Sequence, residues 1–191
     1  MVGTAGKLAA SFLSASVIAA SIASAAPAER FEVVGGCRGG VPNGAYELRM
    51  PDGQLRVAGA FAQGRKTGTF VFWTSRGARI AVVPYDDDAK TGTIARWYTT
   101  TTGGESGRRL EAPYTDNALN GIERSWHANG VLRSELRYEH GTLLSAQAWD
   151  RSGTLLPEAH ARRLAAQDVA ADERVLADLE AIVQDHLPRC E

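Results

Sequence analysis

An internal repeat of about 24 residues constrains the fold of this chain more than any other sequence feature. Three copies share a leading glycine and a tryptophan five residues later: GTFVFW from Gly68, GTIARW from Gly92 and GIERSW from Gly121. The step from Gly68 to Gly92 is 24 residues and the next step is 29, which indicates an insertion of five residues. A period of this length is typical of arrays in which every copy is the same supersecondary unit.

Two weaker copies extend the series. One begins at Gly44 and has Arg49 in the tryptophan position, and a partial copy contains Trp149. The insertion falls in the polar, glycine-rich stretch between Thr99 and Gly107, as expected of a longer hairpin loop.

The second half of each unit predicts a β-strand that ends in a tight turn. An aromatic residue recurs at a fixed offset, and three residues later comes a residue type that tolerates a left-handed backbone: Gly64, Asp88, Asn117 or Gly141. The segments between turns are short, aromatic and β-branched, as strands are. Each unit is therefore predicted to be a β-hairpin, and neighbouring hairpins must stack because one alone cannot bury its apolar face.

The faces of these strands are only partly assigned by alternation. Leu132, Leu136 and Tyr138 share one face of a second strand, while Val131, Arg133, Glu135 and Arg137 take the other, which is predicted to be solvent-exposed. In a first strand Phe70 and Phe72 oppose Val71 and Trp73, and the pattern leaves open which pair is covered.

The pattern resembles the MORN-repeat variant family over residues 41–156, most clearly in NGIERSWHANGVLRSELRYEHG and TGTFVFWTSRGARIAVVPYDDD. The resemblance implies an elongated single-layer antiparallel sheet of successive hairpins. It also implies an interaction or scaffold module, the role of most family members. Some bacterial members are described as antitoxins, and the founding repeats are linked to membranes. Glu123 departs from the family pattern, which usually has an aromatic residue there, and Asp88 and Asn117 replace the turn glycine. The family supplies no catalytic residue.

The N-terminus predicts export. Residues 1–25 carry one lysine, an uncharged apolar run and Ala23-Ser24-Ala25, the small-residue pattern at which signal peptides are cleaved. An uncleaved membrane anchor is the alternative, but the run is short and rich in alanine and serine. We expect a periplasmic or secreted protein, with residues 26–40 as a flexible lead-in to the repeats.

The two cysteines, Cys37 and Cys190, lie near the ends of the mature chain. An even count in an oxidising compartment favours a disulfide, which would contribute about 4–5 kcal/mol in the chain-entropy model. The alternative is two unpaired thiols that are too far apart to meet. Two cysteines spaced so widely do not match the ligand spacing of a zinc site.

Residues 157–191 are predicted to be helical. Glu158 to Leu187 contains no glycine, Pro157 suits a helix start and Pro188 a stop. Apolar residues recur at helical spacing at Leu176, Leu179, Ile182, Val183 and Leu187, and at Leu164 with Asp168 and Asp172 on the opposite side. We expect one or two amphipathic helices that pack on the end of the sheet and cap it. A partner-binding or dimerising helix is the alternative.

Candidate chemistry is sparse. His127 beside Trp126 is the most enzyme-like feature, but no nucleophile or carboxylate is predicted to be held near it in a pocket, and a surface histidine beside a turn is the better interpretation. Asp86-Asp87-Asp88 lacks the alternating ligands of a calcium loop, and the glycines around Cys37 lack the ending of a phosphate loop. We assign no catalytic, cofactor or metal residues. The regularly spaced tryptophans suit core or ladder packing, and stacking on a glycan or peptide is the alternative.

The sequence therefore predicts a mainly β, non-catalytic exported repeat protein that has a C-terminal helical cap. This protein is expected to bind another protein. The full chain has a net charge of −1, and loss of residues 1–25 leaves −2, so no basic footprint points to nucleic acid. A binding module for cell-wall glycan or a membrane surface is the alternative, and an enzyme comes third. The predicted interaction surface is Trp126, His127, Arg133, Glu135 and Arg137.

Overall fold

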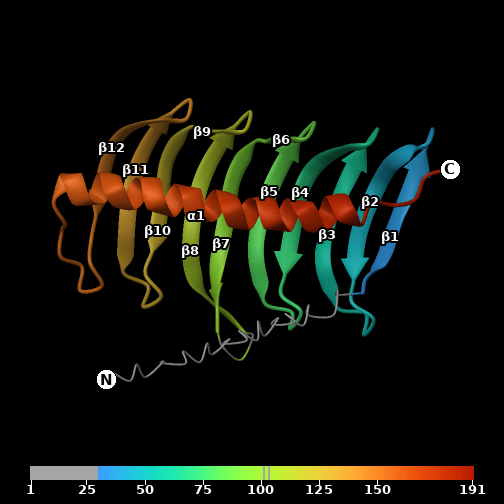
Figure 1. Ribbon diagram of the computed structural model, residues 1–191, viewed down its shortest axis with the longest axis horizontal. Coiled ribbons are helices and arrows are strands. Elements are labelled where there is room, and N and C mark those ends of the chain that lie inside the picture. Colours follow the sequence, from blue (N-terminus) through green and yellow to red (C-terminus); the bar gives the residue numbers. More distant parts are fainter. Residues whose placement is uncertain (1–29, 101, 103) are drawn as a thin grey trace, which may run out of the picture.

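The chain forms one open antiparallel sheet in which strands that follow in sequence lie side by side (Figure 1). The computed structural model describes residues 30–100, 102 and 104–191, so the predicted signal peptide lies outside the described residues. The main path is β1 (Glu32–Arg38), β2 (Val41–Arg49), β3 (Leu55–Ala62), β4 (Arg65–Trp73), β5 (Arg79–Asp86), β7 (Gly92–Thr99), β8 (Glu105–Thr115), β10 (Gly121–Trp126), β11 (Leu132–Glu139) and β12 (Thr142–Ala148). Two short strands, β6 (Ala89–Lys90) and β9 (Ala118–Leu119), pair back onto β5 and β8.

This architecture confirms the predicted elongated hairpin sheet. The segment predicted as a flexible lead-in contains β1, which pairs with β2 from Glu32 opposite Arg49 to Arg38 opposite Val41. β1 and β12 are the two edges of the sheet.

Tight two-residue turns join each second strand to the next unit. Asp87 and Asp88 have φ of 51° and 69°, and the residues that flank them, Asp86 and Ala89, are paired across the hairpin. Positive φ at both central residues defines a type I′ turn, whose twist matches that of the flanking strands. The predicted left-handed residues are confirmed, and the residue before each is left-handed as well. The same geometry recurs at Gly39-Gly40, Gln63-Gly64, Asp116-Asn117 and His140-Gly141.

The turns at the other end of each hairpin introduce an extra residue. Gly77, at φ 82°, donates its N–H to the Thr74 carbonyl at 3.0 Å, and the following pairing shifts by one residue. Trp73 pairs with Arg79 while Phe72 pairs with Ala81, so Ile80 is the extra residue of a β-bulge. The equivalent extra residues are Arg56, Arg109 and Arg133.

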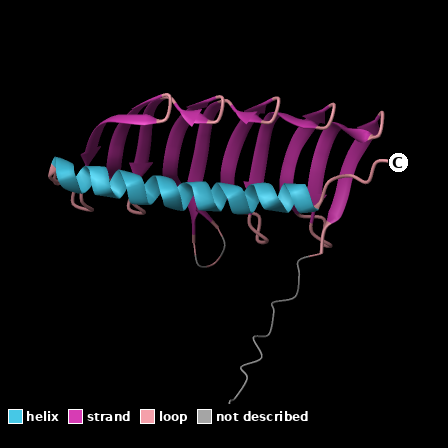
Figure 2. Cartoon of the chain, turned by 45° about the horizontal axis from the view of Figure 1, so that its top comes forward, coloured by secondary structure: helices cyan, strands magenta, loops and turns pink. Residues whose placement is uncertain are grey.

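Among the described residues there is one helix, α1 (Glu158–Asp185), which follows Pro157 and ends before Pro188, as predicted. The predicted helical cap is confirmed, but it does not lie at the end of the sheet. It lies along one face and crosses the strands from β12 to β2 (Figures 1 and 2). Its 28 residues span about 42 Å, close to the width of about 43 Å expected for ten strands. A helix at the end would leave the apolar face of the whole array in water.

The core lies between α1 and the sheet. Phe70 and Phe72 are 0% and 1% exposed, so their face is the one that α1 covers, and Val71 and Trp73 lie on the opposite face. Around Phe70, the rings of Tyr46, Phe61, Phe72 and Tyr85 have centroids within 6.5 Å of its own. α1 contributes its buried residues Ala161, Ala165, Leu176, Leu179 and Val183. The apolar helix positions predicted between Leu176 and Val183 therefore face the core.

The predicted disulfide joins Cys37 on β1 to Cys190 after α1, with Cα atoms 5.6 Å apart. The segment between helix and disulfide is also held by side chains. The Tyr46 hydroxyl donates to the His186 carbonyl at 3.0 Å, and the rings of Phe31 and His186 meet edge to face. The chain thus returns from the last hairpin to the first and is bonded there.

Candidate functional site

The sheet divides the five residues that the sequence predicted as one interaction surface. Trp126, Glu135 and Arg137 lie on the face opposite α1, which we call the open face. There Glu135 accepts from Arg124 Nε at 2.9 Å, and Arg137 is exposed beside Ile122 and Ser145. His127 and Arg133 have other positions.

Arg133 contacts α1 instead of solvent. Its Nε and Nη2 donate to the two carboxylate oxygens of Asp168, both at 2.9 Å. The prediction of an exposed Arg133 was wrong because Arg133 is the extra residue of a bulge, which turns it to the covered face without changing the alternation that follows. Asp168 and Asp172 were predicted on the helix side opposite the apolar residues, and this was wrong too, because both face the sheet.

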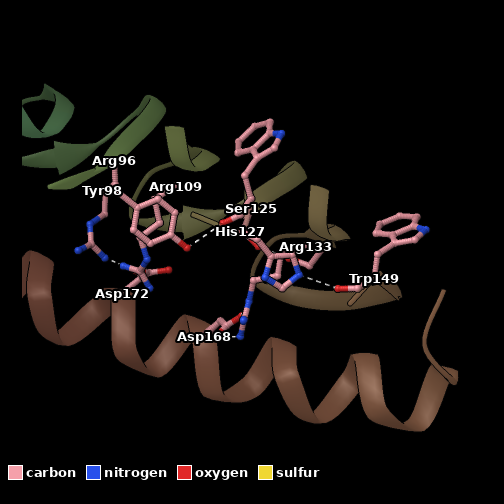
Figure 3. A network of polar contacts seen from close by, with 11 residues as sticks. Arg96, Tyr98, Arg109, Ser125, His127, Arg133, Trp149, Asp168 and Asp172 are labelled. Atoms are coloured by element: carbon pink, nitrogen blue, oxygen red, sulfur yellow. Dashed lines mark hydrogen bonds and ion pairs between the residues drawn. The ribbon is translucent and has the colours of Figure 1, made fainter. Parts of the chain in front are cut away.

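His127 is 9% exposed and is not the surface histidine that was predicted. Its backbone N–H donates to the Val131 carbonyl at 2.8 Å. Its ring Nε2 lies 2.9 Å from the Trp149 carbonyl (Figure 3). Nearby Ser125 is hydrogen-bonded to Ser134, with Oγ atoms 2.6 Å apart. His127 therefore joins its own turn to the following unit.

A polar cluster lies beneath the middle of α1 (Figure 3). Asp172, 7% exposed, accepts from Arg96 and from Arg109 Nη1, the latter at 2.6 Å. Burial raises the pKa of Asp172, and the two guanidinium groups oppose that rise. Such an ion pair gives up its hydration on burial, which offsets much of the attraction between its charges. We define the polar cluster as Arg96, Arg109, Glu123, Arg133, Asp168 and Asp172.

Glu123 is the most unusual member of the cluster. It is 3% exposed and stands two residues after its leading glycine, where other copies have Tyr46, Phe70 or Ile94. Burial, followed by repulsion from Asp172 and Asp168, raises the pKa of Glu123 to about 8. Glu123 is therefore mostly protonated at neutral pH.

A cavity of about 150 Å³ adjoins the cluster and is lined by Tyr98, Arg109, Ser125, Trp126, Arg133, Asp168 and Asp172. At the cavity wall, the Tyr98 hydroxyl donates to the Trp126 carbonyl at 2.8 Å. A polar space of this size suits a few water molecules that bridge helix and sheet.

The open face carries a row of side chains at one end of the strands. Cross-strand partners share a face, and the pairs here are Trp73 with Arg79, Trp97 with Arg108, Trp126 with Leu132 and Trp149 with Leu155. We call these eight residues the Trp row. All four tryptophans are partly exposed, so they form a ladder and not the buried core. Figure 3 shows the Trp149 indole on the side of the strands away from α1.

Trp97 is held between two arginines of the row. The guanidinium carbons of Arg79 and Arg108 lie 3.9 and 4.5 Å from its ring centroid. Arg79 also pairs with Glu105 at 3.0 Å, and Arg108 with Glu111 at 2.8 Å. Sequence reasoning missed both arginines. The signal was present, because the partner follows each tryptophan by six residues once the five-residue insertion is subtracted.

A second row lies beside the Trp row on the open face, and it changes character along the sheet. From β3 to β7 it is small and apolar, with Ala58, Val71, Val82 and Ala95 in register. From β8 to β11 it is charged and alternates in sign, through Glu111, Arg124 and Glu135. The open face thus offers both apolar and polar contacts.

The described residues contain no group of three or more His, Cys, Asp or Glu placed to hold a metal ion. Among them, no helix is long and apolar enough to cross a membrane. No family model matches the chain, and a search of curated proteins finds no match.

Proposed function

We propose that this protein is a non-catalytic, exported interaction module that binds another protein through the open face of its sheet. The observation that carries the proposal is the asymmetry of the sheet. α1 covers one face from β12 to β2, while the other face presents the Trp row and the charged row of Glu111, Arg124 and Glu135. Partly exposed aromatic and arginine side chains are the types enriched at protein interfaces.

Export is supported by two features. Residues 1–25 have the pattern of a cleavable signal peptide. The Cys37–Cys190 disulfide suits an oxidising compartment such as the periplasm or the outside of the cell. The resemblance to MORN-repeat variants supports an interaction role, and an antitoxin or immunity-type binder is one form of it.

A second candidate function is a binding module for cell-wall glycan or a membrane surface. The regular, partly exposed tryptophans favour it, because aromatic rings stack on sugars and sit well at membrane interfaces. Trp97 argues against glycan stacking at its own position, because two guanidinium groups already lie over its ring.

Site-specific photocrosslinking tests the proposal. A photoreactive residue in place of Glu135 probes the open face, and one in place of Arg163, exposed on α1, is the matched control. In cells that naturally produce the protein, the open-face probe is expected to capture a polypeptide that the α1 probe does not. The purified pair should then bind saturably.

Peptidoglycan pull-down and liposome sedimentation provide the opposing arm. Saturable binding there by the mature protein, with no polypeptide captured from position 135, would replace the protein partner with the glycan or membrane alternative.

A further inference from the structure

The tryptophans of the Trp row stand at a constant interval across the sheet. Trp73, Trp97 and Trp126 lie on β4, β7 and β10, and Trp149 directly follows β12. Each of these strands is two places from the next in the sheet order. Neighbouring strands lie about 4.8 Å apart, so successive tryptophans are about 9.6 Å apart along a line perpendicular to the strands.

This interval matches one type of extended chain. A polyproline II helix has three residues per turn and rises about 3.1 Å per residue, which gives a repeat of about 9.3 Å. Laid along the Trp row, it places every third residue at a tryptophan position. At Trp97 that residue packs on the two guanidinium groups that cover the ring, and at the other positions it packs on the indole. An α-helix repeats every 5.4 Å or so, and a β-strand repeats its side-chain direction every 6.8 Å or so, and neither period divides the interval.

The hydrogen-bonding character of the row also selects the occupant. Trp73, Arg79, Trp97, Arg108 and Trp126 are consecutive on the open face, and their side chains are donors that cannot accept. Proline has a backbone carbonyl and no N–H, so a proline-rich segment offers mainly acceptors. Donor-only and acceptor-only surfaces complement each other electrostatically.

The charge of the row favours a neutral segment over a strongly acidic one. Arg79 and Arg108 are each paired with a carboxylate, from Glu105 and Glu111, which offsets their charge. Each arginine uses one nitrogen for that pair, and a guanidinium has five N–H groups, so donors remain for backbone carbonyls.

We propose that the Trp row binds a proline-rich segment of the partner protein in the polyproline II conformation, with three residues per hairpin of this protein. The inference rests on the proposed function and names the chemistry of its partner. A segment of about ten residues spans the four tryptophans, since three intervals of about 9.6 Å correspond to about nine residues.

Peptide titration tests this inference. The mature, oxidised protein is titrated with synthetic peptides of four, seven and ten prolines or so, and binding is followed by tryptophan fluorescence and calorimetry. Affinity is expected to rise with each three-residue step, because each step reaches one more tryptophan. A glycine-serine peptide of the same length as the longest proline peptide is the control and is expected to bind far more weakly.

Variants locate the site. Trp126→Ala is expected to weaken binding of the ten-proline peptide by about tenfold or more, as loss of an aromatic anchor does. Trp126→Phe keeps an aromatic ring and loses the indole donor, so a smaller loss of affinity is expected. This variant provides the test if the alanine variant does not fold. Ile122→Ala is the matched control, since Ile122 is 39% exposed on the open face but outside the row.

Three results would overturn the inference: equal binding of the proline and glycine-serine peptides, binding that does not change in either Trp126 variant, or a lack of dependence on length. Binding of chitohexaose that Trp126→Ala abolishes, without binding of the proline peptide, would assign the row to glycans. If a partner is captured through position 135 and contains no proline-rich contact, the proposed function stands and this inference fails.

Discussion

Arg96 on β7 and Asp172 on α1 form an ion pair whose side chains are 6% and 10% exposed, within the polar cluster beneath the middle of α1. A second arginine, Arg109 on β8, reaches the same carboxylate. The two arginines lie on neighbouring strands, whereas Asp172 follows Arg96 by 76 residues. The three charges meet only when α1 has the correct position along the array.

Replacing Asp172 by Asn is expected to lower the free energy of unfolding by about 3–5 kcal/mol, because Arg96 would remain buried without its counter-charge. Urea unfolding followed by circular dichroism measures the change. Asp178→Asn, on the exposed side of the same helix, is the control and should stay within about 0.5 kcal/mol of the parent. Equal stabilities for the two variants would mean that the buried pair does not hold the helix.

Glu123 predicts a pH-dependent stability. Its pKa is about 8 in the folded chain against an ordinary value of 4.5, so folding favours the protonated form. The stabilisation of the folded state by protonated Glu123 is fully present below about pH 4.5 and is lost as the pH rises toward 8. By pH 7 the loss of stability amounts to at most about 3.5 kcal/mol, at about 1.4 kcal/mol per pH unit.

Glu123→Gln isolates that contribution, because Gln is neutral at every pH and similar in shape. The variant is expected to gain stability over the parent at pH 8 and to differ little from it at pH 4. Thermal unfolding of both proteins across this range measures the difference between them. A constant difference with pH would show that Glu123 keeps an ordinary pKa.

The two faces of β4 predict different costs for neighbouring truncations. Phe70→Ala removes a fully buried ring under α1 and is expected to cost about 3–5 kcal/mol. Val71→Ala, one residue along and on the open face, should cost about 1 kcal/mol. Chemical denaturation of both variants measures the two losses of stability. A larger loss in Val71→Ala than in Phe70→Ala would place the core on the open face and contradict the structure.

The disulfide predicts a loss of about 2–5 kcal/mol in the Cys37→Ser, Cys190→Ser double variant. Reduction of the parent protein should produce a similar decrease, measured by urea unfolding with and without reductant. Two free thiols in the unfolded, unreduced parent would contradict the bond itself.

The repeat made most of the sheet predictable. Residues such as Asp88 and Asn117 sit where only a left-handed backbone closes a two-residue hairpin, so their spacing marked the turns and the order of the strands. The two cysteines were also paired correctly. The turns follow from local residue types, and the disulfide follows from the number of cysteines, so both can be predicted without the fold.

The errors came from features that alternation does not encode. A β-bulge adds one residue without a change in sequence type, so Arg133 looked exposed although it binds Asp168. Likewise, the aspartates of α1 looked like a solvent face because their arginine partners are distant in sequence. His127 looked like a surface group because its partner, the Trp149 carbonyl, belongs to another unit. Each of these three misses concerns polar side chains whose burial depends on a partner elsewhere in the fold.

The course of α1 also limits how this array can change in evolution. In most repeat proteins a unit can be duplicated or deleted because each touches only its neighbours. Here a single helix runs back from β12 to β2, and its far end is bonded to β1 through Cys37 and Cys190. An added hairpin would widen the sheet by about 9.6 Å and would require about six more helical residues. α1 therefore acts as a molecular ruler, and hairpin number and helix length must change together.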